Sequence, residues 1–252
     1  RIFNCWYDEG HSFQNIVNAI KNSCNVYFYR VGQMLGVDTI SKYSSDFGLG
    51  KKTYIELPGE KQGLVPSSKW KKQQYKQDWY AGETANFSIG QGYLLVTPLQ
   101  LARLPSVIAT RGVLSQPIIV KKIIHNDGET FDALIQSKKQ LGYKKNNFEI
   151  IIRGMKAVVN SQYSTGRHAK IKNAVVCGKT GTVQVAGRDK VGKNKSKIPW
   201  KLRNHAWFAC FADEKNPVLA MSVFVEHGES GGGKAAVVAH DILERIFDEK
   251  LR

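Results

Sequence analysis

The chain has 252 residues, 42% of them hydrophobic, and a formal net charge of +16. This length can bury a sizeable core, as one large domain or two small ones. The charge favours an acidic partner such as nucleic acid, an anionic membrane surface or a polyanionic polymer. No run of 18 apolar residues is present, so no segment of this sequence is expected to span a membrane. The four cysteines lack the CxxC spacing of a zinc ribbon or a thioredoxin-type site.

The first half of the sequence predicts several helices. Residues 13–36 carry apolar side chains at helical spacing, with a polar break at Asn22–Asn25, and this pattern predicts two helices that meet at the break. Residues 37–50 predict a short helix closed by glycines. The stretch 52–96 is rich in glycine, proline and lysine and is predicted to consist mainly of loops. The pair Thr97–Pro98 is typical of a helix start.

The second half predicts an antiparallel sheet between helices. An Asp-Gly turn in "HNDGE" predicts a hairpin over 116–134, and "NNFEIIIRGMKAVVN" has the period of an amphipathic helix. Three consecutive strands and a last helix are predicted at 173–185, 204–212, 217–226 and 234–250. Strands that follow one another in this way indicate the α+β class rather than a doubly wound parallel sheet.

A basic loop, residues 188–203, separates the first two of these strands. It is dense in lysine and arginine and has few apolar residues. Two interpretations stay open for it. One is a solvated hairpin loop, and the other is a patch that binds anionic lipid or glycan.

The strand-like stretch "VVCGKTGTVQV" at 175–185 raises a chemical question, because a lysine and two threonines interrupt it around a glycine. A phosphate-binding loop would require glycine at position 173, where the residue is Asn173, and a helix after the motif. Both features are missing, so nucleotide binding is not expected.

One interpretation of this stretch is an edge strand that binds an extended peptide. Gly181 lets a substrate backbone come close, and Lys179 offers a positive charge to a carboxylate. Thr180 and Thr182 offer hydroxyl groups to the same carboxylate, while a backbone N–H can point at a developing oxyanion. The alternative interpretation is a structural strand with an exposed lysine.

A second motif, Ser23-Cys24-Asn25, lies at the predicted helix break. K-T-G, S-x-N and S-x-x-K are the three elements of serine penicillin-recognising enzymes. The chain resembles the transpeptidase domain of class B penicillin-binding proteins, of the elongation-type penicillin-binding protein 2, over 1–252. The stretches "SIGQGYLLVTPLQLA" at 88–102 and "VEHGESGGGKAAVVA" at 225–239 also carry the resemblance. It implies a serine β-lactamase-like fold, an antiparallel sheet with helices on both faces.

The resemblance also implies roles for individual residues. Ser23 would relay a proton towards the leaving amine, and Asn25 would hold the acyl amide of the peptide. Lys179 would complete the relay. Thr180 and Thr182 would grip the terminal D-Ala carboxylate, with the N–H of Thr182 as half of the oxyanion hole. The reaction would be a two-step acyl transfer from D-Ala-D-Ala stem peptides.

The same resemblance also implies ligands, a partner and a cellular location for the protein. We expect peptidoglycan stem peptides and β-lactams as ligands, a membrane glycosyltransferase of the elongation machinery as partner, and the periplasmic face of the inner membrane as location. The chemistry requires no cofactor. A nucleic-acid-binding protein is the competing explanation of the charge, but no base-reading motif is recognisable.

The third family motif, S-x-x-K, would supply the nucleophilic serine. The sole S-x-x-K match, Ser68–Lys71, follows S-x-N in a predicted loop and is treated as coincidence. The chain opens on arginine without methionine, and we expect a fragment that lacks the nucleophilic serine and the family's N-terminal strands and helix. Such a fragment would be inactive alone and would leave strand 217–226 with an unpaired edge. The alternative is a catalytically dead remnant that binds peptides or partners; Pro105, inside a predicted helix, favours decay.

Cys5, His11 and Cys24 form a possible structural zinc site, because thiolate and imidazole are good zinc ligands and Asp8 is a candidate fourth. Some penicillin-binding proteins of this subtype are similar in carrying zinc beside S-x-N. A Cys5–Cys24 disulfide and two unlinked thiols are the alternatives that remain open. Cys177 lies in an apolar strand-like run and is expected to be a buried, inert thiol, as is Cys210.

Overall fold

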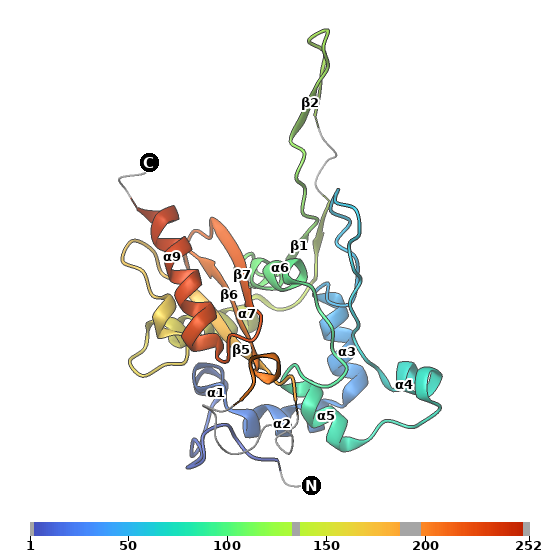
Figure 1. The fold of residues 1–252 in the computed structure, drawn as a ribbon, viewed down its shortest axis with the longest axis vertical. Helices are drawn as coiled ribbons and strands as arrows, with labels where there is room; N and C mark the ends of the chain where they lie inside the picture. Colours follow the sequence, from blue (N-terminus) through green and yellow to red (C-terminus); the bar gives the residue numbers. More distant parts are fainter. Residues whose placement is uncertain (1–2, 133–136, 187–197, 249–252) are drawn as a thin grey trace.

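The computed structural model describes residues 3–132, 137–186 and 198–248. Its centre is a three-stranded antiparallel sheet in the order β5-β6-β7 (Figure 1). The strands are β5 (Cys177–Val183), β6 (His205–Ala212) and β7 (Leu219–Val225). All three predicted strands are present, with the first shorter than expected. Within the described residues β5 and β7 each pair only with β6, so both are edge strands.

Helices cover both faces of this sheet, because side chains alternate along each strand. On one face, Phe208 and Cys210 pack with the last helix, α9 (Ala236–Phe247). On the other face, Phe211 packs with α6 (Pro98–Ala109) and α7 (Lys145–Asn160). The expected α+β architecture is therefore confirmed.

The predicted helix break at residues 22–25 is confirmed. Helix α1 (Ile16–Asn22) ends one residue before Ser23, and α2 (Asn25–Leu35) begins two residues after it. Helix α1 packs against α7, where a Cβ on Gly154 would come within 3.0 Å of three Ile20 carbons. The glycine thus lets the two helices approach closely. Helix α3 (Val37–Asp46) follows, as predicted.

Loops were predicted for residues 52–96, but this stretch contains two helices, α4 (Ser68–Tyr75) and α5 (Ala81–Ser88). Both are short and lack a clear apolar period. Local capping starts them: the Ser67 hydroxyl accepts the Trp70 N–H, and the Glu83 carboxylate accepts the Tyr80 N–H. The prediction failed because caps and tertiary contacts, rather than an apolar stripe, stabilise these helices.

Helix α6 shows how Pro105 is accommodated. The helix runs from Pro98 to Ala109 with Pro105 buried inside it. Thr97 accepts the Gln100 N–H at 3.2 Å, and the Gln100 side chain reaches back to Thr97, so the start of the helix is firmly capped. The helix continues through Pro105 to Ala109, so this proline does not end it.

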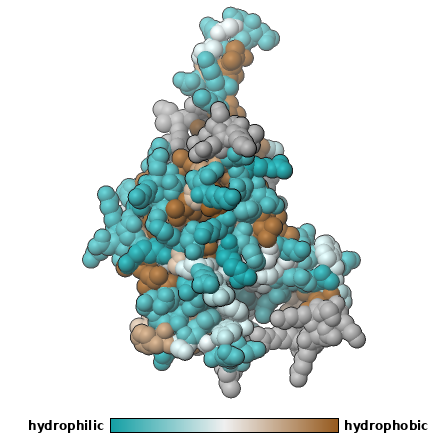
Figure 2. Space-filling view, turned by 90° about the vertical axis from the view of Figure 1, so that its left-hand side faces the viewer, coloured by the Kyte–Doolittle hydropathy of each residue, from teal (hydrophilic) through white to brown (hydrophobic). Residues whose placement is uncertain are grey.

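The predicted hairpin is confirmed as β2 (Lys122–Ile124) paired with β3 (Thr130–Asp132). Below it, β1 (Val113–Ser115) pairs with β4 (Lys138–Gln140). Figure 1 shows this arm projecting far from the sheet, and Figure 2 shows apolar side chains among hydrophilic ones on it.

The remaining described elements are single turns. They are a 3-10 turn at Arg167–Ala169, another at Trp200–Leu202, and a π-turn at Gly231–Ala235 that leads into α9. The basic loop 188–203 falls largely on residues 187–197, outside the described ranges. None of the helices in the described part of the chain combines the length and apolar character needed to cross a bilayer.

Candidate active site

The S-x-N and K-T-G motifs lie in contact in the folded chain. The Lys179 Nζ atom lies 2.8 Å from the Ser23 Oγ atom, although 156 positions separate the residues. Lys179 projects from edge strand β5, and Ser23 lies at the junction of α1 and α2. The ammonium also donates to the Thr180 carbonyl at 2.9 Å. The structure therefore brings a lysine and a serine hydroxyl into direct hydrogen-bond contact.

The backbone at the helix junction explains the position of Ser23. Its φ of 51° and ψ of 46° are left-handed, and its N–H donates to the Ile20 carbonyl at 3.2 Å, which closes α1. The Trp6 indole donates to the Ser23 carbonyl at 3.0 Å. Asn25, half-buried, then occupies the first position of α2. The turn thus places the serine and the asparagine of S-x-N at one helix junction.

Burial changes the proton affinity of Lys179. Lys179 is half-buried at the edge of β5, and loss of solvent around its ammonium lowers the pKa of Lys179 to about 8. A group with a pKa near neutrality exists in both protonation states at physiological pH. Lys179 can therefore both accept and donate a proton, which an exposed lysine cannot do efficiently.

The other residues of the "GKTGT" motif have distinct environments. Thr182 is exposed, and its hydroxyl accepts the Gly231 N–H at 3.4 Å. The side chains of Thr180 and Thr182 alternate with that of Lys179 along β5, and the edge of β5 is shared by both faces of the sheet. A Cβ on Gly231 would lie 2.4 Å from the Gly181 carbonyl oxygen, so Gly231 must be glycine for the π-turn to sit against β5. Sequence reasoning missed this contact, although the run of three glycines marked the segment.

The first glycine of the motif has a packing role. A Cβ on Gly178 would lie 2.4 Å from Cζ of Phe208, a fully buried residue of β6. The aromatic ring therefore occupies the space that a side chain at position 178 would need. The absence of a side chain there is required by the core and not by a ligand.

The S-x-x-K match at 68–71 lies on helix α4, not in a loop, so Ser68 and Lys71 are one helical turn apart. Both side chains are already engaged. The Ser68 hydroxyl donates to Asp38 at 2.6 Å, and the Lys71 ammonium forms an ion pair with Glu83. Ser68 therefore lacks the lysine contact that would activate it.

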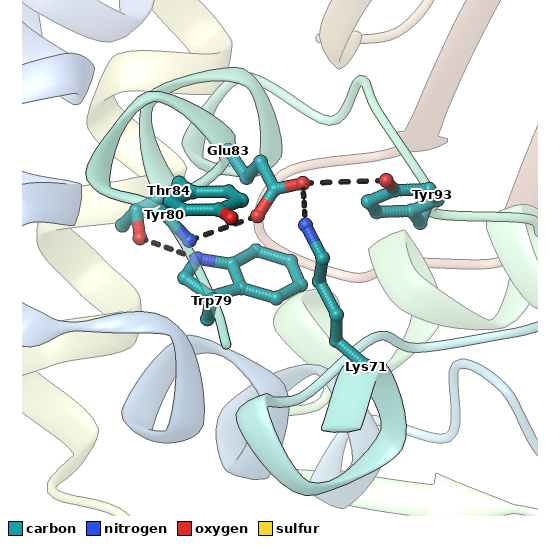
Figure 3. A network of polar contacts seen from close by, with 6 residues as sticks. All are labelled: Lys71, Trp79, Tyr80, Glu83, Thr84 and Tyr93. Atoms are coloured by element: carbon teal, nitrogen blue, oxygen red, sulfur yellow. Dashed lines mark hydrogen bonds and ion pairs between the residues drawn. The ribbon is translucent and has the colours of Figure 1, made fainter. Parts of the chain in front are cut away.

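The surroundings of Lys71 form a polar network inside an aromatic cluster (Figure 3). Its ammonium lies 4.7 Å from the centre of the Tyr80 ring and 5.6 Å from that of Tyr93. Tyr93 also donates to Glu83 at 3.2 Å. Burial alone would lower the pKa of Lys71, but the hydrogen bond to Glu83 and the charge of that carboxylate outweigh it, so the pKa of Lys71 is raised. The lysine is thus a charged structural anchor between α4 and α5.

Cys5, His11 and Cys24 come together next to the helix junction. Their ligand atoms all lie within 4.8 Å of one another, and the Cys5 Sγ atom is 3.2 Å from the His11 Nδ1 atom. Both cysteines are free thiols, so the disulfide alternative is not what the structure describes. Burial lowers the pKa of His11, which favours the neutral imidazole that metals bind. Among the described residues Asp8, the suggested fourth ligand, is not part of this grouping.

The two strand cysteines behave as predicted. Cys177 and Cys210 are buried free thiols on adjacent strands. Burial raises the pKa of each to about 12. A thiol that stays protonated is a poor nucleophile, so both are inert core residues.

Comparison with known proteins identifies relatives over nearly the whole chain. The model of the penicillin binding protein transpeptidase domain matches residues 1–244. The peptidoglycan D,D-transpeptidase MrdA of Haemophilus influenzae is 33% identical over 99% of this chain and 39% of that protein. MrdA of Escherichia coli K12 is 30% identical over 96% of this chain and 38% of its own length.

Solved structures give the same result. Pseudomonas aeruginosa PBP2 in complex with WCK 5153 superposes with a TM-score of 0.81 at 33% identity, covering 97% of this chain and 52% of that one. Helicobacter pylori PBP2 in a complex with MreC gives 0.78 at 32% identity, covering 97% of this chain and 42% of that one. The chain spans about two fifths of the length of the curated relatives it matches. The chain belongs to the penicillin-binding protein transpeptidase domain family, in its elongation-type penicillin-binding protein 2 branch.

Proposed function

We propose that the chain is the S-x-N and K-T-G bearing part of a peptidoglycan D,D-transpeptidase, within a transpeptidase domain that includes residues 1–252. The observation that carries this proposal is the 2.8 Å contact between Lys179 and Ser23 beside an open strand edge. A depressed lysine pKa next to a serine hydroxyl is the arrangement that a proton relay in acyl transfer requires.

The proposed reaction has two halves. A serine oxygen attacks the carbonyl of the penultimate D-Ala, forming an ester as the peptide C–N bond breaks and the terminal D-Ala leaves with a proton. An amine of a neighbouring stem peptide then attacks the ester, forms the cross-link and releases the serine. A β-lactam imitates the dipeptide, and its opened ring stays attached to the serine.

The residues of the site would divide this work. Lys179 and Ser23 pass the proton to the leaving D-Ala, and Asn25 at the start of α2 holds the amide on the acyl side. Thr180 and Thr182 receive the terminal carboxylate at the edge of β5. The N–H of Thr182 faces the developing oxyanion, whose charge fixed N–H donors stabilise without reorganising.

The attacking serine of this proposal comes from outside the 252 residues. Ser68 bonds to Asp38, and Lys71 is paired with Glu83, so this S-x-x-K match is not a free nucleophile and base. The chain by itself would then bind at most peptide or partner and would not be acylated. The membrane glycosyltransferase partner and the periplasmic face of the inner membrane belong to the same proposal.

The structural zinc is proposed for Cys5, His11 and Cys24, whose donor atoms fit a site of mixed sulfur and nitrogen ligands. The metal would tie the segment that carries Cys5 to the residue next to Ser23, and it would take no part in proton transfer. The test is metal analysis of the purified chain before and after thiol blocking. Zinc released by the blocking reagent supports the site, and metal-free protein that takes up no added zinc rules it out.

Labelling with a fluorescent penicillin tests the catalytic proposal. The 252-residue chain is expected to gain no covalent mass, whereas the gene product extended upstream of residue 1 is expected to be labelled once. A Ser68→Ala variant of the extended protein serves as the matched control and keeps full labelling. An adduct on Ser68 of the short chain would refute the assignment of the nucleophile.

A further inference from the structure

A polar cavity whose lining includes neither Ser23 nor Lys179 lies at the foot of the projecting arm. Its volume is about 270 Å³, and it is lined by residues of α3, the following loop, α6 and the β1–β4 pair. This size admits a phosphate, a carboxylate or one sugar ring, but not a folded peptide. We call it the arm-base pocket.

Four cationic side chains line the arm-base pocket: Lys51, Lys52, Arg103 and Lys139. Within the described ranges none of the four takes part in an ion pair. Two carboxylates offset part of this charge. Asp46 lines the pocket and interacts with Lys51, but it also accepts from Lys42 at 2.7 Å and from the Tyr143 hydroxyl at 2.6 Å. Glu60 interacts electrostatically with Lys52 and Arg103. The cavity therefore carries an excess of positive charge that a bound anion would neutralise.

Arg103 is held in the wall of the pocket. Its Nε atom donates to the Ser115 carbonyl at 2.9 Å, which fixes the plane of the guanidinium. Gly48, with a φ of 88°, lies so close that an added Cβ would be 3.3 Å from the Nη1 atom. Burial lowers the pKa of Arg103, the signature of a cation withdrawn from water. The fork of a fixed guanidinium suits a planar carboxylate or a phosphate.

Tyr54 adds an aromatic platform at the rim. Its side chain is 74% exposed, and its backbone is held at φ 59°, which is unusual for an aromatic residue. The Glu60 carboxylate accepts its N–H at 3.1 Å, and the Gln116 amide donates to its carbonyl at 2.9 Å. These contacts hold the backbone of Tyr54, and its exposed ring offers a flat apolar surface to the C–H face of a sugar.

We propose that the arm-base pocket binds an acidic saccharide, with the cations on its carboxylate or phosphate and the Tyr54 ring against its sugar ring. This site is separate from the proposed acyl-transfer site. Saccharide binding and penicillin labelling therefore test two different sites, and failure of one leaves the other unaffected.

The experiment is calorimetric titration of the 252-residue chain with four probes. N-acetylmuramic acid and N-acetylglucosamine 6-phosphate carry the anion on a carboxylate and on a phosphate, respectively; N-acetylglucosamine lacks the anion, and inorganic phosphate lacks the sugar. At least one acidic sugar is expected to bind about tenfold more tightly than either control, because charge and ring contacts are both needed. Which of the two acidic sugars binds identifies the source of the anion.

Variants separate a built pocket from a merely basic surface. Lys52→Gln is expected to weaken binding about threefold, and Lys69→Gln, an exposed lysine of α4, to leave it unchanged. Tyr54→Ala should weaken binding by a similar factor. Tyr163→Ala is its matched control, since Tyr163 is also exposed, at 82%, with a φ of 57°.

Three outcomes would overturn the proposal. The first is that neither acidic sugar shows saturable binding. The second is that N-acetylglucosamine binds as tightly as the acidic sugars. The third is that inorganic phosphate binds as tightly as the acidic sugars and that Tyr54→Ala leaves their affinity unchanged.

Discussion

Replacing Lys179 with methionine tests whether the burial of this ammonium has the energetic consequence the structure implies. Methionine keeps an unbranched side chain of similar length and removes the titrating group. The pKa of Lys179 falls from 10.5 to about 8 on folding. This difference corresponds to about 3 kcal/mol of free energy of unfolding.

The sign of the effect follows from proton binding. Between pH 8 and 10.5 the unfolded chain keeps the proton on Lys179 while the folded chain has released it. The stability of the wild type therefore rises through this window, and the cost of burying the charge is fully present below about pH 8. The methionine variant lacks this contribution at every pH.

Urea denaturation at a series of pH values from 7 to 10.5 measures the effect. The quantity compared is the free energy of unfolding of Lys179→Met minus that of the wild type. This difference is expected to be about 3 kcal/mol larger at pH 7 than at pH 10.5. Lys69→Met, which replaces an exposed lysine, is the control and should show no such trend. A difference between Lys179→Met and wild type that stays constant with pH would refute the reasoning.

Three further substitutions probe the framework of the site. Gly178→Ala should lower the free energy of unfolding by about 2 kcal/mol in urea denaturation, because the new Cβ meets the Phe208 ring at 2.4 Å; an unchanged midpoint would contradict this. Glu83→Gln should lower the Tm, since it leaves the enclosed Lys71 ammonium without an anion; a Tm equal to wild type would show that the pair is not needed. Thr97→Ala should cost about 1 kcal/mol through loss of the helix cap, and thermal denaturation that shows no loss would argue against capping.

The helix junction at Ser23 could be predicted from the sequence because its signals are local. An apolar period on each side of a polar break determines two helices, and the left-handed backbone of Ser23 closes the first of them. The three strands of the sheet were readable for the same reason. Strands β6 and β7 are rich in apolar and aromatic residues over lengths that strands prefer, and β-branched valines flank the polar middle of β5.

The helices α4 and α5 could not be predicted in this way. Their stability depends on contacts between residues far apart in the sequence, such as Ser68 with Asp38 and Lys71 with Glu83. The same limit applies to the site. The approach of Lys179 to Ser23 was expected from motif resemblance, not from any periodicity, and the contact of Gly231 with Thr182 was not expected at all. Long-range packing decides such contacts.

A double-mutant cycle on acylation most directly tests the claim that Lys179 and Ser23 act as one relay. Second-order rates of penicillin acylation would be measured in the gene product extended upstream of residue 1, for Lys179→Ala, Ser23→Ala and the double variant. Two residues of one relay should be strongly non-additive, so the double variant is expected to be about as slow as the slower single variant. Rate losses that simply multiply in the double variant would show that the two residues act independently, and the account would be wrong.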